Sequence, residues 1–144
     1  MYNERVVLTG ASGRLGQALV PRLRSEGYFL ILVGRDELKL RRLFPTEKCV
    51  SFETLAPNLE KNDVIVYLAA RNNDQDGTMD DFRIANVDKA LTVFEMAEFA
   101  RVKRFIFFQV YGRSTHLASR KRIITLDLSS RLSVHLQRVQ IKCS

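Results

Sequence analysis

A glycine-rich turn near the amino terminus, residues 9–16 (Thr-Gly-Ala-Ser-Gly-Arg-Leu-Gly), has the clearest chemical potential in this sequence. In the spacing G-x-x-G-x-x-G, one glycine permits a tight turn, another lets the backbone approach a phosphate, and the third lets a helix pack against a strand. Because the N–H groups at the start of a helix carry the positive end of its dipole, we predict that the turn binds a diphosphate. The predicted contact residues are Gly10, Ser12, Gly13, Arg14, Leu15 and Gly16. The alternative is a plain strand–turn–helix junction built from small residues.

The end of the second apolar run carries a second signal, Val33-Gly34-Arg35-Asp36. About 20 residues beyond the glycines, an acid accepts hydrogen bonds from a free ribose hydroxyl, whereas a basic residue accommodates a 2′-phosphate. Gly34 holds the expected position of the acid, Arg35 follows it, and Arg14 offers a second guanidinium from the turn. We therefore predict NADP as the cofactor in preference to NAD. In the alternative, both arginines are solvated and Asp36 only caps a helix.

Alternating apolar runs and amphipathic stretches must position these groups. Strands are expected at residues 5–9, 29–33, 49–52, 64–70 and 104–108. Helices are expected at residues 14–26, 36–43 and 82–100, with a short crossover at 55–61 and a left-handed cap at Gly27. Because strand and helix alternate through five strands, the sequence predicts an α/β fold with a doubly wound parallel sheet of about five strands.

Four motifs occur in order along the chain. They are the glycine-rich turn, the strand at residues 63–70 (Asp-Val-Ile-Val-Tyr-Leu-Ala-Ala), Asn86 at the start of the long helix, and the strand that ends in Val110-Tyr111-Gly112. Together they resemble the extended short-chain dehydrogenase/reductases, the NAD-dependent epimerase/dehydratase group, many of whose members act on nucleotide sugars. The resemblance covers residues 5–112, roughly the cofactor-binding half of a family member, and implies a Rossmann-like fold.

The resemblance also implies roles for residues beyond the turn. Leu68, Ala69 and Ala70 would line the ribose and nicotinamide side of the cofactor, where small residues leave room for a flat ring. Asn86 would anchor the loop after the fourth strand, or in the alternative only bond the local backbone. Glu53 stands near the place where the family often has an adenine-contacting Asp. Family dimers commonly use the helix near residues 82–100 together with a helix that is not found here, so a homodimer is one expected assembly.

The family's catalytic pair is missing from these 144 residues. The resemblance implies a Tyr with a Lys four residues later, which lowers the Tyr pKa and holds the ribose. The tyrosines Tyr2, Tyr28, Tyr67 and Tyr111 are followed four residues on by Val6, Leu32, Arg71 and Thr115. Gln109 stands where a Ser or Thr is expected. We therefore assign no catalytic residue, and a regulatory sensor that binds the dinucleotide without turnover is the alternative function.

No metal site is expected either. The acids in the loop after the fourth strand lack the ordered spacing of a calcium site, which favours a solvated acidic loop. These acids are Asp74, Asp76, Asp80 and Asp81. The two cysteines, Cys49 and Cys143, show neither metal spacing nor a disulfide framework, so a reducing cytoplasm is the expected compartment. No apolar run approaches the roughly 20 residues of a membrane span, and no signal peptide opens the chain.

The net charge of +7 is concentrated at the carboxyl end. Residues 1–112 hold 16 basic and 15 acidic side chains, whereas residues 113–144 hold 7 basic and one acidic. All glycines and prolines lie in the first part. We therefore divide the chain into a dinucleotide-binding domain, residues 1–112, and an atypical basic tail, residues 113–144.

Three hypotheses account for the tail. Ser, Leu and Arg, which have six codons each, make up 16 of its 32 residues, as expected for a truncated gene or a wrong reading frame. Alternatively, apolar residues that alternate at 124–128 and 132–136 predict a basic hairpin over the edge of the sheet. Nucleic-acid binding is the third and weakest hypothesis, because the tail has no aromatic residue to stack on bases.

Overall fold

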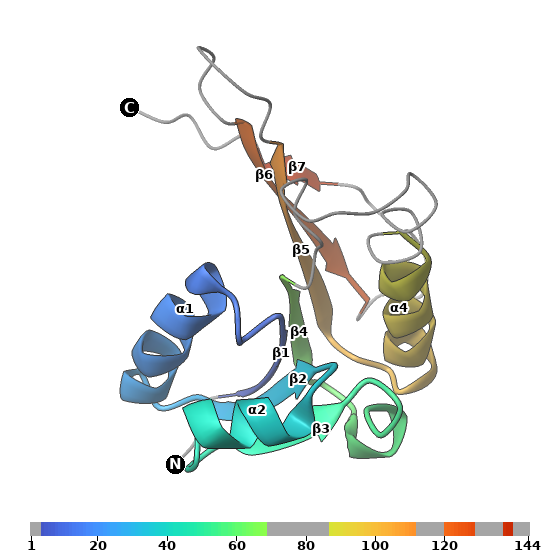
Figure 1. Ribbon diagram of the computed structural model, residues 1–144. Helices are drawn as coiled ribbons and strands as arrows, with labels where there is room; N and C mark the ends of the chain where they lie inside the picture. The colour runs from blue at the N-terminus through green and yellow to red at the C-terminus, as the bar shows by residue number, and fades with distance from the viewer. Residues whose placement is uncertain (1–3, 69–86, 112–119, 129–136, 140–144) are drawn as a thin grey trace.

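The computed structural model describes residues 4–68, 87–111, 120–128 and 137–139. Its strands form one sheet in the order β3-β2-β1-β4-β5-β6-β7 (Figure 1). They are β1 (Arg5–Thr9), β2 (Phe29–Gly34), β3 (Lys48–Ser51), β4 (Val64–Tyr67), β5 (Arg104–Tyr111), β6 (Arg120–Asp127) and β7 (Gln137–Val139). The first five pair in parallel, and β6 and β7 pair antiparallel. The predicted α/β fold with a five-stranded parallel sheet is confirmed, and two antiparallel strands extend it.

Helices cover both faces of the sheet. They are α1 (Arg14–Ser25), α2 (Glu37–Leu43), the single 3-10 turn η1 (Ala56–Asn58) and α4 (Lys89–Phe99). On the α1 and α2 face, Val6 and Leu8 of β1 pack in a cluster with Leu40 of α2. On the α4 face, Val7 joins a second cluster with Val93. Alternate residues of one strand therefore enter different cores, which is the doubly wound arrangement seen in Figure 1.

Most expected boundaries agree with the structure to within one or two residues. At the end of α1, Gly27 has a φ of 89°, and the N–H of Tyr28 donates to the carbonyl of Leu23, so the predicted left-handed cap is confirmed. The strand expected at 64–70 ends at Tyr67. The helix expected at 82–100 begins at Lys89, and residues 82–86 lie outside the described residues.

The carboxyl-terminal strands extend the sheet beyond β5. β5 runs to Tyr111, past the expected end at residue 108, and pairs with β6 from Arg104↔Asp127 to Tyr111↔Arg120. The first strand of the hairpin hypothesis thus falls largely within β6, whereas its second strand, residues 132–136, lies outside the described residues. β7 follows at residues 137–139. Antiparallel pairing with β5 sets the bounds of β6, and the local alternation of apolar residues could not reveal this pairing. The division at residue 112 stays a prediction, although strands from both sides of it share one sheet.

A network at the amino ends of the strands fixes β1 to the start of β4. Asp63 is buried, and its carboxylate accepts from Arg5 Nε at 2.8 Å and from the backbone N–H of Glu60 at 2.8 Å. The same guanidinium donates to the Glu60 carboxylate at 2.6 Å and to the Asn58 carbonyl at 2.8 Å. This network ties β1 to the crossover between β3 and β4 at the amino ends of the strands. It thereby helps to fix the register of β1 and β4, whose carboxyl ends lie at the opposite edge of the sheet.

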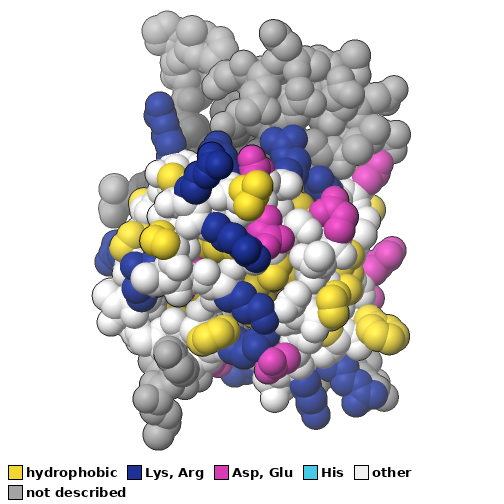
Figure 2. All heavy atoms as spheres, turned by 60° about the horizontal axis from the view of Figure 1, so that its bottom comes forward, with side chains coloured by type: hydrophobic (Ala, Val, Ile, Leu, Met, Phe, Trp, Pro, Cys, Tyr) yellow, Lys and Arg dark blue, Asp and Glu magenta, His cyan; other side chains and the backbone are white. Residues whose placement is uncertain are grey.

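The surface seen in Figure 2 mixes the two signs of charge, with Lys and Arg side chains interspersed among Asp and Glu. In the described part of the chain, no helix is both long enough and apolar enough to cross a membrane.

Candidate functional site

The glycine-rich turn lies at the carboxyl end of β1 and opens α1, as the sequence predicts. Gly10 has a φ of 77°, in the left-handed region that a residue with a Cβ rarely adopts. Its N–H donates to the carbonyl of Val33 at 3.3 Å, and the N–H of Gly13 donates back to the carbonyl of Gly10 at 3.2 Å. The turn is therefore closed on itself and held against the end of β2.

The other two glycines of the turn differ in what surrounds them. A Cβ on Gly16 would lie 2.4 Å from the carbonyl oxygen of Gly10 and 2.5 Å from the Cα of Ala11, which is closer than Cβ atoms come in real proteins. A Cβ on Gly13 would meet only that same oxygen, at 3.4 Å, which is an ordinary contact. Gly16 is buried and Gly13 is exposed. The fold therefore requires glycine at 10 and 16, whereas the glycine at 13 leaves room on the solvent side of the turn.

The start of α1 presents free N–H groups on that side. Gly13 is the N-cap, so no side chain caps the helix, and the first turn holds no acidic residue. Among the described residues, no acceptor is present for the N–H groups of Arg14, Leu15 and Gly16. The next residue, Gln17, makes the first helical hydrogen bond, from its N–H to the Gly13 carbonyl, and its side chain donates to the Ser12 carbonyl. Three unsatisfied donors at the positive end of a helix dipole fit a bound anion such as a diphosphate.

Arg14 is the first residue of α1, and Arg35 lies in the loop between β2 and α2. Both side chains are exposed, and no carboxylate among the described residues pairs with either. Other arginines are paired, since Arg24 bonds to Glu47 and Arg41 to Glu37. Thr9 pairs with Val33 at the ends of β1 and β2, so the segments that carry the two guanidinium groups are neighbours. The structure brings both segments together at one edge of the sheet.

Asp36 is a helix cap. Its side chain accepts from the N–H of Lys39 at 3.0 Å, and α2 begins at the next residue. This confirms one part of the alternative interpretation and leaves Gly34 at the position where a ribose-binding acid would stand.

Thr9 and Leu68 join β1 to β4 next to the turn. The N–H of Leu68 donates to both the carbonyl oxygen of Thr9, at 3.2 Å, and its hydroxyl, at 3.1 Å. Leu68 is half-buried against the core of the α1 and α2 face. The glycine-rich pattern includes Thr9 but predicts no role for it; the available signal was a hydroxyl residue at the end of an otherwise apolar strand. Ala69, Ala70 and Asn86 lie outside the described residues, as do Asp74, Asp76, Asp80 and Asp81.

Glu53 is exposed just after β3. Its own backbone N–H and the Ser51 side chain donate to the carboxylate and lower the pKa of Glu53, and Lys89 acts in the same direction. Lys89 comes from the start of α4, where its ammonium lies 4.7 Å from the ring centre of Phe52. Glu53 is therefore anionic at neutral pH, and its suggested contact with adenine stays a prediction.

Tyr67 ends β4 with its side chain in the core. Its ring stacks on Phe107, with centres 5.5 Å apart, and on Phe105 at 6.0 Å. The hydroxyl is buried without a hydrogen-bond partner in the described structure. Burial raises the pKa of Tyr67 to about 12, the opposite of the lowered pKa that the family's tyrosine needs.

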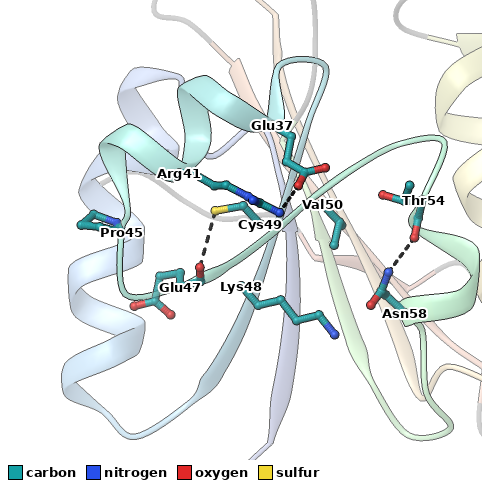
Figure 3. Close-up of a pocket in the computed structure, with 9 residues that line it drawn as sticks. All are labelled: Glu37, Arg41, Pro45, Glu47, Lys48, Cys49, Val50, Thr54 and Asn58. Carbon is teal, nitrogen blue, oxygen red and sulfur yellow. Dashed lines mark hydrogen bonds and ion pairs between the residues drawn. The ribbon is translucent and has the colours of Figure 1, made fainter.

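A hollow of about 550 Å³ lies on the outer side of the edge strand β3, between α2 and η1 (Figure 3). None of the residues predicted to bind the dinucleotide lines it. Glu37 pairs with Arg41 there, and Cys49 Sγ donates to the Glu47 carbonyl at 3.7 Å. Burial raises the pKa of the Cys49 thiol. The Glu37 and Glu47 carboxylates are already paired, with Arg41 and Arg24, so the turn at the carboxyl end of β1 is the better candidate site.

Comparison with known proteins identifies the family of the chain. Residues 6–130 match the profile of the "NAD dependent epimerase/dehydratase family". No curated protein sequence matches the chain. A short-chain dehydrogenase/reductase superfamily protein from Agrobacterium tumefaciens, solved with bound NAD, is 25% identical with a TM-score of 0.59 over 72% of this chain and 32% of that one.

Two further solved structures share the fold. UDP-N-acetylglucosamine 4-epimerase from Bacillus cereus is 22% identical, with a TM-score of 0.57 over 73% of this chain and 39% of that one. Yeast methylglyoxal/isovaleraldehyde reductase, solved with NADPH, is 17% identical, with a TM-score of 0.59 over 72% of this chain and 36% of that one. The chain thus spans between about a third and two-fifths of the length of these proteins. With the glycine-rich turn in place and most of its length matched, the chain belongs to the NAD-dependent epimerase/dehydratase family, whose members bind NAD(P).

Proposed function

We propose that this chain binds NADPH in preference to NADH at the carboxyl ends of β1, β2 and β4. The observation that carries the proposal is the uncapped start of α1, where three N–H groups have no acceptor among the described residues and the turn is open at Gly13. These N–H groups would hold the pyrophosphate, with Gly10 and Gly16 keeping the turn close to the helix. When bound, the cofactor supplies or accepts a hydride at its nicotinamide ring.

The preference for the phosphorylated cofactor rests on Arg35 and Arg14. A 2′-phosphate needs a positive partner and tolerates no adjacent carboxylate, and the end of β2 offers Arg35 beside the bare Gly34. Asp36, the nearest acid, is engaged in capping α2. Leu68, Ala69 and Ala70 complete the proposed site on the ribose and nicotinamide side.

We further propose that these 144 residues bind the cofactor without turnover. They contain no Tyr-x-x-x-Lys pair, and Tyr67, at the end of β4, is buried with a raised pKa. A regulatory dinucleotide sensor is the second candidate function, because it needs binding and no proton donor. For a complete enzyme of this kind, the family favours a nucleotide sugar as the substrate. The cytoplasm stays the proposed compartment, on the cysteine usage alone.

The outer face of α4 supports a homodimer. Leu91 and Phe99 of α4 are large apolar side chains with exposed fractions of 55% and 94%, and Val87, two residues before the helix, is 50% exposed. Exposed apolar side chains that gather on one helix are typical of a surface that is covered by a partner. Phe99→Asp should convert a dimer to a monomer in sedimentation velocity, and an unchanged sedimentation coefficient would contradict this contact.

Titration with NADPH and NADH tests the cofactor assignment. Because the chain has no Trp, binding is followed by the fluorescence of the reduced nicotinamide or by calorimetry. Loss of a charged hydrogen-bond partner costs about 1.5–3 kcal/mol, so Arg35→Asp should weaken NADPH binding by roughly 10- to 150-fold and leave NADH binding nearly unchanged. Arg42→Asp, the same charge change on an exposed residue of α2, is the control and should leave the ratio of the two affinities unchanged.

The outcomes separate the hypotheses. If the wild-type chain binds neither cofactor, both the dinucleotide function and the sensor are wrong. An unchanged NADPH/NADH ratio in Arg35→Asp refutes the preference for NADPH. Salt-dependent DNA binding that disappears when residues 113–144 are deleted would instead support the nucleic-acid hypothesis.

A further inference from the structure

Gly34, the last residue of β2, faces the side chain of Leu40. A Cβ built on Gly34 would lie 2.8 Å from Leu40 Cδ1, 3.3 Å from its Cγ and 3.8 Å from its Cδ2. The first of these distances is shorter than Cβ atoms tolerate. Leu40 therefore occupies the space that any side chain at position 34 would need.

Leu40 has little freedom to move away. It is 1% exposed and packs in the cluster that contains Leu32 and Phe44, on the α1 and α2 face of the sheet. Its helix is held at both ends, because Asp36 caps the start and the N–H of Phe44 donates to the Leu40 carbonyl at 2.8 Å.

Gly34 is fixed as well, since it pairs with Ser51 of β3 in the parallel register. With α2 and the β2–β3 pair both held, a side chain at 34 must displace the end of Leu40 within a close-packed core.

We propose that Leu40 is a specificity-determining residue for the dinucleotide, acting through position 34. Because Leu40 fills the space above Gly34, position 34 cannot hold an Asp or Glu side chain at the end of β2. Arg35 is then the side chain that meets the 2′ position of the ribose. Positions 34 and 40 therefore act as a pair, and cofactor preference can be reversed at 34 only when residue 40 is made smaller. This inference rests on the proposed NADPH preference, because an acid at 34 would accept from a ribose hydroxyl and repel a phosphate.

The first test measures the packing without any cofactor. Gly34→Ala is introduced into the full chain with Leu40 and into Leu40→Ala and Leu40→Val, and urea unfolding is followed by circular dichroism. With Leu40 present, overpacking should raise the unfolding equilibrium constant by about 5- to 150-fold. In the Leu40→Ala chain this penalty should disappear, and Leu40→Val repeats the comparison if Leu40→Ala does not fold.

Gly13→Ala is the matched control. Its Cβ would meet only the Gly10 carbonyl, at 3.4 Å, so its effect on unfolding should be the same in every background. If the effect of Gly34→Ala is equally independent of residue 40, the steric coupling does not exist and the inference is overturned.

The second test measures discrimination, which a purely structural role for Leu40 would not change. The ratio of NADH to NADPH dissociation constants is determined for Gly34→Asp alone and together with Leu40→Val or Leu40→Ala. The ratio should fall at least about tenfold further in the double variants, because the carboxylate can then take its position at the end of β2.

Each outcome has a separate meaning. The inference is supported if the effect of Gly34→Ala on unfolding depends on residue 40 and the ratio of NADH to NADPH dissociation constants also falls further in the double variants. If the effect on unfolding depends on residue 40 but this ratio is the same in the single and double variants, Leu40 packs against position 34 but does not determine specificity. If the wild-type chain binds neither cofactor, the proposed function is wrong and Leu40 has no role in specificity. The urea measurements still test the packing between positions 34 and 40 in that case, because they need no ligand.

Discussion

The three glycines of the turn offer the sharpest test of the site, because the structure gives two of them opposite tasks. Replacing Gly16 by Ala should destabilise the fold, whereas replacing Gly13 by Ala should preserve the fold and impair cofactor binding. A simple motif match predicts the same loss of binding for both.

The magnitudes follow from the contacts of the added methyl group. At Gly16 the methyl would lie 2.4 Å from a backbone oxygen and 2.5 Å from a backbone carbon, so about 1 Å of relief is needed to reach the ordinary contact range of 3.4–4 Å. Neither neighbour is a flexible side chain, so α1 must move off the sheet and strain its contact through the buried Val20. Overpacking of this kind costs about 1–3 kcal/mol.

At Gly13 two small effects oppose each other. Its φ of −76° suits any residue, and its Cβ would make one ordinary contact. Alanine restricts the unfolded chain there, which stabilises the fold by about 0.4–1 kcal/mol, but it is a poorer N-cap residue than glycine by a similar amount, so the free energy of unfolding should stay nearly unchanged. The methyl group would nevertheless occupy the open side of the turn, where the proposed pyrophosphate approaches the backbone.

The assay combines urea unfolding at 222 nm with NADPH titration. We expect a lower unfolding midpoint for Gly16→Ala only, and at least about tenfold weaker NADPH binding for Gly13→Ala at an undiminished midpoint. Equal midpoints in the two variants would show that the close contact at Gly16 is relieved at no cost. Wild-type affinity in Gly13→Ala would show that the phosphate does not approach the turn on its open side.

Three further predictions concern stability and need only unfolding measurements. Tyr67→Phe should raise the free energy of unfolding by about 1 kcal/mol at neutral pH, since it removes a buried hydroxyl that lacks a partner in the described structure. Burial raises the folded-state pKa of Tyr67 from 10.0 to about 12, so the stability that its protonated form contributes below pH 10 is lost between pH 10 and 12. The unfolding midpoint should therefore depend less on pH over this range in Tyr67→Phe than in the wild-type chain. Parallel curves for the two proteins would contradict this prediction. Arg101 has a φ of 57° just after α4, in the position that Gly27 holds after α1, so Arg101→Gly should stabilise the protein by roughly 1 kcal/mol, and a lower midpoint would be the contrary result. Asp63→Ala should cost about 3 kcal/mol by leaving Arg5 without its buried partner, whereas a cost below about 1 kcal/mol would mean that Glu60 and Asn58 suffice for that guanidinium.

Local patterns in the sequence were sufficient for most of the fold. The apolar run at residues 5–9 became β1 with the same bounds, because a short buried strand needs little more than its own hydrophobicity and the glycine that follows. Asp36 and Gly27 were predicted as caps from residue type alone, since capping depends on contacts within three or four residues. The bounds of β6 were predicted less well, because its antiparallel pairing with β5 joins residues from 9 to 23 positions apart in the chain.

Some features of the candidate site also follow from the sequence alone, and others follow only from the tertiary structure. The sequence by itself determined that a glycine-rich turn joins a strand to a helix and that Arg35 follows a glycine where an acid is expected, because spacing and residue type are properties of the chain. Only the tertiary structure decided which glycine the packing requires, that Thr9 holds β4 beside the turn, and that Leu40 occupies the space above Gly34. Each of these depends on the distance between atoms of different elements, and such distances are set by how α1, α2 and the sheet pack together.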